Sequence, residues 1–314
     1  MDSQSVAILI APNLSPRFIQ LMLSSLALAA SIQVQAQTEL SAEFSLGIEH
    51  DSNVAVEEVD TSSDQGDEGT VMSAEFELAH KFTDKTKASI SYNYNQIAYD
   101  TFDDLSRTTH MLGANFSTAV GKVNTGVSYF YIDALLDGDD FLTYQRASPW
   151  VSGFVSKRWF LRGAYVYGDK EIARRPGRDA KNDSAEFDAY YFWQGLRRYF
   201  NLGYTYRSED SQADRFDYDA HLFKLRFVQR FQLFSALSTF EIGARYEQRD
   251  YSSVTPSIGE ERDDDKLRFK AELEIPLGEK LSWELYAGYN DYQSNLPSAD
   301  YDQTVVGTKL VLAF

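Results

Sequence analysis

Alternation of apolar and polar residues with period 2 is the feature of this sequence that most constrains its fold. In Glu39 to Glu49 (E-L-S-A-E-F-S-L-G-I-E) and in Leu267 to Ile275 (L-R-F-K-A-E-L-E-I), every second side chain is apolar. Side chains of an extended strand point alternately to opposite faces, so each of these segments has one apolar and one polar face. The pattern therefore predicts long, two-faced β-strands.

The alternation recurs in fourteen segments along the chain. They are 39–50, 70–82, 86–99, 107–119, 122–135, 142–157, 159–169, 184–196, 198–209, 216–231, 236–250, 264–276, 280–292 and 302–314. Each has about ten residues or more, which lets a tilted strand cross the apolar band of about 25 Å of an outer-membrane barrel. Pro149 interrupts the sixth segment, where we expect a bulge or a bend.

The connections between these segments are alternately short and long. Thr83-Asp84-Lys85 is a short one, and the long ones include 51–69, 136–141, 170–183 and 251–263. Short turns on one side, long loops on the other and an even strand count are typical of transmembrane barrels. A secreted β-sandwich also alternates, but its strands are shorter. The predicted fold is an all-β, antiparallel, up-and-down transmembrane β-barrel of about 14 strands, of the bacterial outer-membrane type.

The N-terminal residues predict the compartment. Arg17 precedes the compact apolar run Phe18 to Ala30, and V-Q-A-Q follows at residues 34–37. This arrangement is typical of a secretory signal peptide. We expect residues 1–36 to be removed by cleavage near Ala36, unless translation starts at Met22, and residues 37–314 to form the barrel. The expected location is the outer membrane of a Gram-negative bacterium.

Charge and composition exclude several function classes. The formal net charge is −17 and the chain has no cysteine, which argues against nucleic acid as a partner and excludes thiol catalysis and cysteine-ligated zinc. Among four histidines only His50, followed by Asp51-Ser52, has the neighbours that a hydrolytic site at a strand end needs. We therefore expect no cofactor and no enzymatic activity.

The polar faces of the predicted strands carry charges of both signs, and we expect these side chains to point into the lumen. The candidates are Glu241, Arg245, Glu247, Arg268, Lys270, Glu272 and Glu274. Rows of mixed sign on neighbouring strands favour structural pairing over a dedicated conduction path.

Two of the predicted loops have opposite charge. The stretch from Asp51 to Thr70 contains seven acidic residues and no Lys or Arg, and we expect it to be solvated, with cations bridging it to lipid phosphates. The other loop has five basic residues, which are Lys170, Arg174, Arg175, Arg178 and Lys181. For this loop the sequence leaves three roles open: binding lipopolysaccharide phosphates, docking an acidic client, or folding inward as a constriction.

The C-terminal segment has a pattern of its own. Gly307, Leu310, Leu312 and Phe314 resemble the C-terminal signal by which the barrel assembly machinery recognises its clients, although Val305 stands where the pattern has a polar residue. The resemblance implies that this machinery and the outer-membrane lipids are partners of the chain.

Two further stretches carry a family resemblance. E-H-D-S-N-V (Glu49 to Val54) leaves the first segment, and Y-Q-S-N-L-P-S-A-D-Y-D (Tyr292 to Asp302) enters the last. Together they resemble the barrel domain of surface lipoprotein assembly modifiers. That resemblance implies a 14-stranded barrel that helps deliver a lipoprotein client to the cell surface.

Members of that family carry a periplasmic helical-repeat domain before the barrel. Here the first predicted strand follows the predicted cleavage site directly, so a translocator role implies a periplasmic partner chain that handles the client. The alternatives are a passive porin, a polysaccharide conduit and a structural surface protein.

Overall fold

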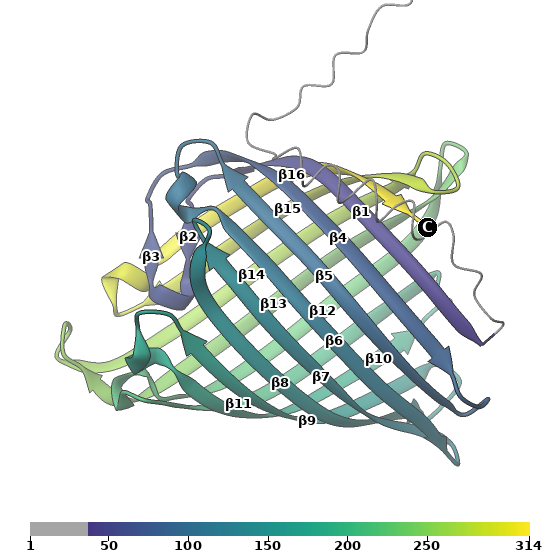
Figure 1. The fold of residues 1–314 in the computed structure, drawn as a ribbon, viewed down its shortest axis with the longest axis horizontal. Coiled ribbons are helices and arrows are strands. Elements are labelled where there is room, and N and C mark those ends of the chain that lie inside the picture. Colours follow the sequence, from purple (N-terminus) through teal and green to yellow (C-terminus); the bar gives the residue numbers. More distant parts are fainter. Residues whose placement is uncertain (1–36) are drawn as a thin grey trace, which may run out of the picture.

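The computed structural model describes residues 37–314, which form a closed antiparallel β-barrel of fourteen strands (Figure 1). The strands of the barrel are β1 (Thr38–Asp51), β4 (Asp67–Lys81), β5 (Thr86–Tyr99), β6 (Arg107–Val120), β7 (Val123–Leu136), β8 (Asp139–Phe154), β9 (Trp159–Ile172), β10 (Ala180–Phe192), β11 (Arg198–Ser211), β12 (Tyr218–Leu233), β13 (Ala236–Thr255), β14 (Glu260–Pro276), β15 (Leu281–Ser294) and β16 (Tyr301–Ala313). Each of the fourteen alternating segments overlaps one of these strands, which confirms the predicted fold class. The predicted signal peptide, residues 1–36, lies outside the described residues.

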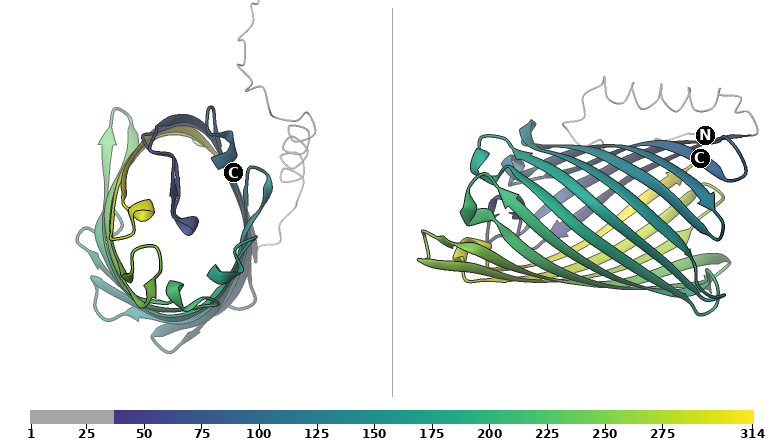
Figure 2. Two further views of the ribbon diagram at one scale, coloured as in Figure 1. Left: turned by 90° about the vertical axis from the view of Figure 1, so that its left-hand side faces the viewer. Right: turned by 90° about the horizontal axis from the view of Figure 1, so that it is seen from below.

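Each strand pairs with its neighbours in the chain, and β1 closes the barrel against β16. In this closing pair Leu46 lies opposite Leu310, and β1 begins at the same end of the barrel at which β16 finishes. That end carries short turns, and we call it the turn end. The opposite end, the loop end, carries the longer connections (Figure 2). In outer-membrane barrels the turn end faces the periplasm and the loop end faces the exterior.

The outer face of the barrel is apolar. Leu46, Ile48, Leu112 and Leu310 are 56%, 62%, 50% and 51% exposed, and in a bilayer they would contact hydrocarbon. Such long strands satisfy their backbone hydrogen bonds through the closed ladder, which a membrane-spanning strand requires. None of the described residues belongs to a helix that could cross a membrane.

The prediction of a bulge at Pro149 is wrong, although the pairing with β9 is interrupted there. The register between β7 and β8 runs unchanged through the pair Val127 and Pro149. Pairs with β9 lapse only at Ser148 and Pro149, because proline has no N–H to donate. The register shift lies instead beside Phe141, between Leu142, which pairs with Ala134, and Asp140, which pairs with Leu135.

Two predicted long loops are also largely strand. Residues 137–138 alone join β7 to β8, with φ of 52° at Asp137 and 76° at Gly138. Strands β13 and β14 extend into residues 251–263 from both sides and leave only a turn that starts after Thr255 and ends before Glu260. These extensions were missed because beyond the apolar band both faces of a strand are polar, so the alternation that reveals strands disappears.

Candidate functional site

The segment between β1 and β4 lies inside the barrel rather than outside it. We call residues 52–66 loop L1. It contains β2 (Ala55–Val56), the short 3₁₀ helix η1 (Glu57–Val59) and β3 (Thr61–Ser62), and β2 pairs with β3 as a small hairpin. Figure 2 shows this purple segment within the ring of strands, near the loop end.

Buried polar residues at the end of β1 turn L1 into the lumen. Asp51 is 1% exposed, and its carboxylate accepts hydrogen bonds from the backbone N–H of Asn53 at 3.0 Å, from the Tyr99 hydroxyl at 3.0 Å and from the Gln303 amide at 2.7 Å. The Asn53 side chain donates to the Asp302 carbonyl at 3.0 Å. These bonds fix the direction in which the chain leaves the wall.

Asn53 also holds the two arms of L1 together. Its Oδ1 accepts the Ser62 hydroxyl at 2.6 Å and the Asp64 backbone N–H at 3.0 Å. Such side-chain bonds to nearby backbone are the usual use of asparagine in turns.

An apolar cluster fixes the middle of L1 to the wall. Val56 and Val59 are 2% and 7% exposed, and they pack with Ala134, Phe141 and Ile172. Burying each valine contributes about 1.5–3 kcal/mol. Phe141 is the residue beside the register shift between β7 and β8, so the bulge coincides with the place where the wall contacts L1.

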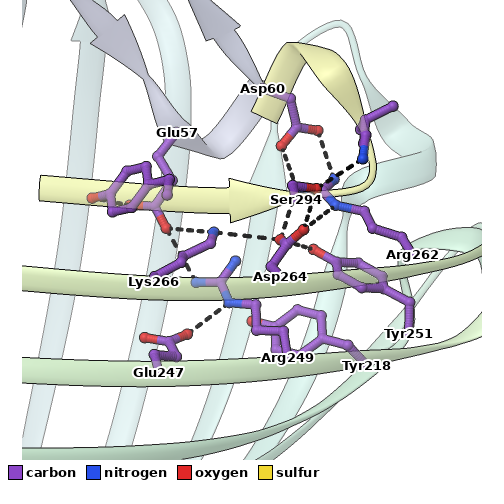
Figure 3. Close-up of polar contacts among 12 residues, drawn as sticks. Glu57, Asp60, Tyr218, Glu247, Arg249, Tyr251, Arg262, Asp264, Lys266 and Ser294 are labelled. Atoms are coloured by element: carbon purple, nitrogen blue, oxygen red, sulfur yellow. Dashed lines mark hydrogen bonds and ion pairs between the residues drawn. The ribbon is translucent and has the colours of Figure 1, made fainter. Parts of the chain in front are cut away.

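The Glu57 carboxylate lies among four donors from the opposite wall, and Figure 3 shows it beside two of them, Arg249 and Lys266. Arg249 Nη2 and Lys266 Nζ donate to Oε1 at 3.2 and 2.9 Å, and Arg268 Nη2 donates to Oε2 at 2.6 Å. The fourth donor is the Tyr292 hydroxyl, 3.4 Å from Oε2. Burial alone would raise the pKa of Glu57, but the charges of Lys266, Arg249 and Arg268 outweigh burial and hold that pKa well below its ordinary value.

Asp60 forms the second ionic contact of L1. Arg262 donates Nη2 to Oδ1 at 2.9 Å and Nη1 to Oδ2 at 3.1 Å, and Arg178 Nη2 also donates to Oδ2. The pair with Arg262 is the two-bond fork that suits a carboxylate. Burial opposes ionisation of Asp60, but bonding to Arg262 and the charges of both arginines lower its pKa.

Two carboxylates of the wall complete this network. The Glu247 side chain is 1% exposed, and it pairs with Arg245 at 2.8 Å and with Arg249 at 2.6 Å. The Asp264 side chain is also 1% exposed and pairs with Arg262 at 2.7 Å. Removing one partner of such a buried pair is costly, whereas the intact pair adds little stability. The network therefore specifies where L1 lies more than it strengthens the barrel.

Cavities remain on both sides of L1. One, of about 700 Å³, is lined by residues of β1, of β4 to β8 and of β14 to β16, and by Glu57 and Glu58 of L1. Another, of about 280 Å³, lies between L1 and the wall from β8 to β14 and is lined by Arg178, Arg207, Arg245 and Tyr218 among others. L1 thus narrows the lumen and leaves space on either side.

The predicted lumen residues all lie on the strand face that carries the Glu57 partners. Glu241 pairs with Arg226, Arg245 with Glu247, Arg268 with Glu57, and Lys270 with Glu272 at 2.6 Å. Glu274 lies opposite Thr239 in the register of β13 and β14.

Three residues of the network were missed by the sequence prediction. Arg262, Asp264 and Lys266 precede Arg268 at intervals of two and share its face of β14. Continuing the period-2 pattern by three steps toward the N-terminus would have placed them in the lumen. Arg262 was instead assigned to the predicted loop 251–263.

The acidic loop is not solvated as predicted, because Glu57 and Asp60 are paired inside the barrel. The basic loop has a divided arrangement. Arg175 donates to the Val59 carbonyl at 3.5 Å and Arg178 to the Glu58 carbonyl at 3.1 Å, so this part folds inward. The other three lie elsewhere: Lys170 pairs with Glu209, the exposed Arg174 with Asp139, and Lys181 is exposed on β10.

The C-terminal residues lie on β16 and at its end. A side chain at Gly307 would meet the Tyr286 ring at 2.3 Å, so this position requires glycine as the strands are placed. Leu310 faces outward, and Leu312 pairs with Phe44 across the closing strands. Phe314 packs edge-on against Phe44 with ring centres 6.4 Å apart, and its N–H donates to the Ala42 carbonyl.

His50 bonds to Glu68 at 3.0 Å, while the Ser52 hydroxyl accepts the Thr304 N–H at 2.8 Å. Within residues 37–314, no group of three or more His, Asp or Glu side chains is placed to hold a metal ion.

Comparisons with known proteins agree with this architecture. No protein-family model and no curated protein matches the sequence. Among solved structures, the chain is similar to outer-membrane expressed OmpT of Vibrio cholerae, with a TM-score of 0.55 and 8% identity over 90% of this chain and 99% of that one. It is also similar to an anion-selective porin from Comamonas acidovorans, with a TM-score of 0.52 and 9% identity over 88% of this chain and 99% of that one. The likeness shows the fold: the chain has the β-barrel fold of outer-membrane proteins.

Proposed function

We propose that this protein is an outer-membrane channel of the porin type, in which small polar solutes pass beside L1. The observation that carries the proposal is L1 itself, held inside the barrel by ion pairs while cavities of about 700 and 280 Å³ remain on its two sides. A barrel of 14 strands lies between small barrels filled by their own side chains and porins of 16–18 strands with open channels. An inserted loop that narrows the lumen suits a pore for solutes a few atoms across.

The lining of the lumen supports the same function. Charged side chains at mid-height are paired with one another, for example Arg146 with Glu186 at 2.6 Å and Lys224 with Asp188 at 2.9 Å. A polar, paired lining keeps the lumen hydrated.

Planar-bilayer recording of the refolded chain, residues 37–314, tests this function. We expect a small, steady conductance that rises several-fold when residues 55–62 are replaced by a short glycine-serine linker, because the linker removes the part of L1 that fills the lumen. A matched variant, Asp64→Asn, alters only an exposed residue of L1 and should conduct like the natural protein. Silence of both the natural and the shortened barrel would contradict a porin function.

A second candidate is delivery of lipoproteins to the cell surface, as in the surface lipoprotein assembly modifiers. The stretches that carry this resemblance meet in the structure, where the Asn53 side chain donates to the Asp302 carbonyl. Beside this bond, the Ser52 N–H donates to the Thr304 carbonyl and the Ser52 hydroxyl accepts the Thr304 N–H. They form the base of L1 where β1 meets β16.

Deletion of the gene in its host separates the two candidates. Loss of one lipoprotein from the surface, measured by protease shaving of intact cells, would support delivery. Unchanged exposure of all lipoproteins would remove it and leave the porin function.

A further inference from the structure

The wall that faces L1 carries an excess of positive charge. Among the described residues, seven basic side chains join the network around L1, and they are Arg178, Arg207, Arg245, Arg249, Arg262, Lys266 and Arg268. The wall itself supplies two carboxylates to these bases, Glu247 and Asp264. The nearby pair of Lys170 and Glu209 is neutral by itself. Without L1, this wall would be strongly basic in a protein of net charge −17.

The carboxylates of L1 are held as a bound acid would be held. Glu57 receives three cationic donors and one hydroxyl, and Asp60 receives the two-bond fork of Arg262 together with Arg178. Charge-assisted and forked bonds of this kind are the strongest that proteins use for carboxylates. Both acids come from a loop that is not part of the barrel wall.

Aromatic rings orient the bases independently of L1. Arg249 lies over the Tyr218 ring at 4.9 Å, and Arg262 lies over the Tyr251 ring at 4.7 Å. Both contacts are made within the wall, so the guanidinium groups would stay in place if L1 moved away. The cavity of about 280 Å³ borders this wall and also L1, which gives a solute access to the bases.

We propose that the basic wall of β13 and β14 is a binding site for solutes that carry two or more carboxylates, and that Glu57 and Asp60 occupy this site when the solute is absent. The substrate class is therefore that of short acidic oligosaccharides and other polycarboxylates. A solute that binds displaces the carboxylates of Glu57 and Asp60, and the lumen beside L1 becomes wider for that solute. This site rests on the proposed porin function, because the channel must let the solute reach it. Binding of the solute can nevertheless be measured without conduction.

Calorimetric titration of the refolded chain in detergent tests the site, with trigalacturonate as the acidic probe and maltotriose as a neutral probe of equal length. The double variant Glu57→Gln/Asp60→Asn removes the internal competitor. If L1 occupies nine-tenths of the sites or more, this variant should bind trigalacturonate at least about tenfold more tightly than the natural protein. Binding should weaken as salt is added, and maltotriose should bind to neither form.

Two variants complete the test. Asp64→Asn removes one acidic charge from the exposed part of L1, and it should bind trigalacturonate like the natural protein. Arg268→Gln, added to the double variant, should reverse the gain in affinity for trigalacturonate. This change removes the donor that lies nearest to the Glu57 carboxylate in the natural protein. If the double variant does not fold, Glu57→Gln alone should bind trigalacturonate more tightly than the natural protein, by a smaller factor.

Equal binding of trigalacturonate by the natural and double-variant proteins, or a gain that Asp64→Asn reproduces, would overturn the proposal. Failure of the porin function has a different signature, since a silent barrel in planar bilayers could still bind the acidic probe. Conduction without any binding of trigalacturonate would leave the porin function standing and refute the site.

Discussion

Glu57 is a carboxylate whose ionised state is stabilised by three cations from the opposite wall. Its folded pKa lies below the ordinary value of 4.5, so the stabilisation is fully present above that value and is lost only as pH falls through the lower, folded pKa. We predict that L1 stays anchored when the pH is lowered from about 7 to about 4.5. The chain has no native cysteine, so a spin label on Asp64→Cys would report the mobility of L1.

A mobility transition centred on the ordinary glutamate value would contradict this prediction. The control is the same spin label in a Glu57→Gln background. There, the change in label mobility that is caused by protonation of Glu57 should disappear.

Asn53 joins three backbone or side-chain partners at the base of L1 and is 8% exposed. We predict that Asn53→Ala loosens L1, because each buried group left without its partner costs about 1–3 kcal/mol. The spin label on L1 should become mobile while the barrel stays folded. Asn295→Ala is a matched control, because Asn295 also bonds to backbone but is exposed, so water can replace its bonds; equal effects of the two changes would refute the role of Asn53.

At the scale of elements, the joint between β1 and β16 is the place where the barrel closes, and Gly47 lies in it. A side chain at Gly47 would meet the Thr308 carbonyl oxygen at 2.1 Å and the Lys309 Cβ at 2.5 Å. We predict that Gly47→Ala destabilises the closed barrel by about 1–3 kcal/mol, the usual cost of overpacking. The urea midpoint of unfolding in detergent should fall, whereas Gly278→Ala, at a turn with open space around it, should leave the midpoint unchanged.

The strands could be predicted from sequence because the bilayer and the lumen impose opposite demands on alternate residues. Leu267 to Ile275 shows this in one strand, with Phe269 exposed to the outside and Arg268 paired inside. The position of L1 could not be predicted in this way. Glu57 is 192 residues from Arg249 and 211 from Arg268, and an acidic loop has the same composition whether it is solvated or paired.

The bulge beside Phe141 escaped prediction for a related reason. It coincides with the packing of Phe141 against Val56 and Val59 of L1, whereas proline, the visible signal in the sequence, is accommodated without a change of register. The contact at Phe141 comes from a distant part of the chain, so local residue types do not reveal it.

At the scale of the whole molecule, the charges are separated by position. The protein is acidic as a whole, with a net charge of −17, yet seven of its basic residues gather around L1 within the lumen. This separation is consistent with a wall that binds acidic groups, first those of its own loop. The barrel supplies the frame, and the strands of L1 are not part of its closed strand ladder.

The location of L1 inside the lumen is the claim on which the channel and the binding site both depend, and thiol labelling tests it directly. In the cysteine-free chain, Val59→Cys places a thiol of similar size in the cluster between L1 and the wall, where Val59 is 7% exposed. In the folded barrel, a bulky polyethylene glycol maleimide should modify Val59→Cys at least about tenfold more slowly than the exposed Asp64→Cys. Equal rates for the two thiols would show that L1 lies outside the barrel and would contradict the account.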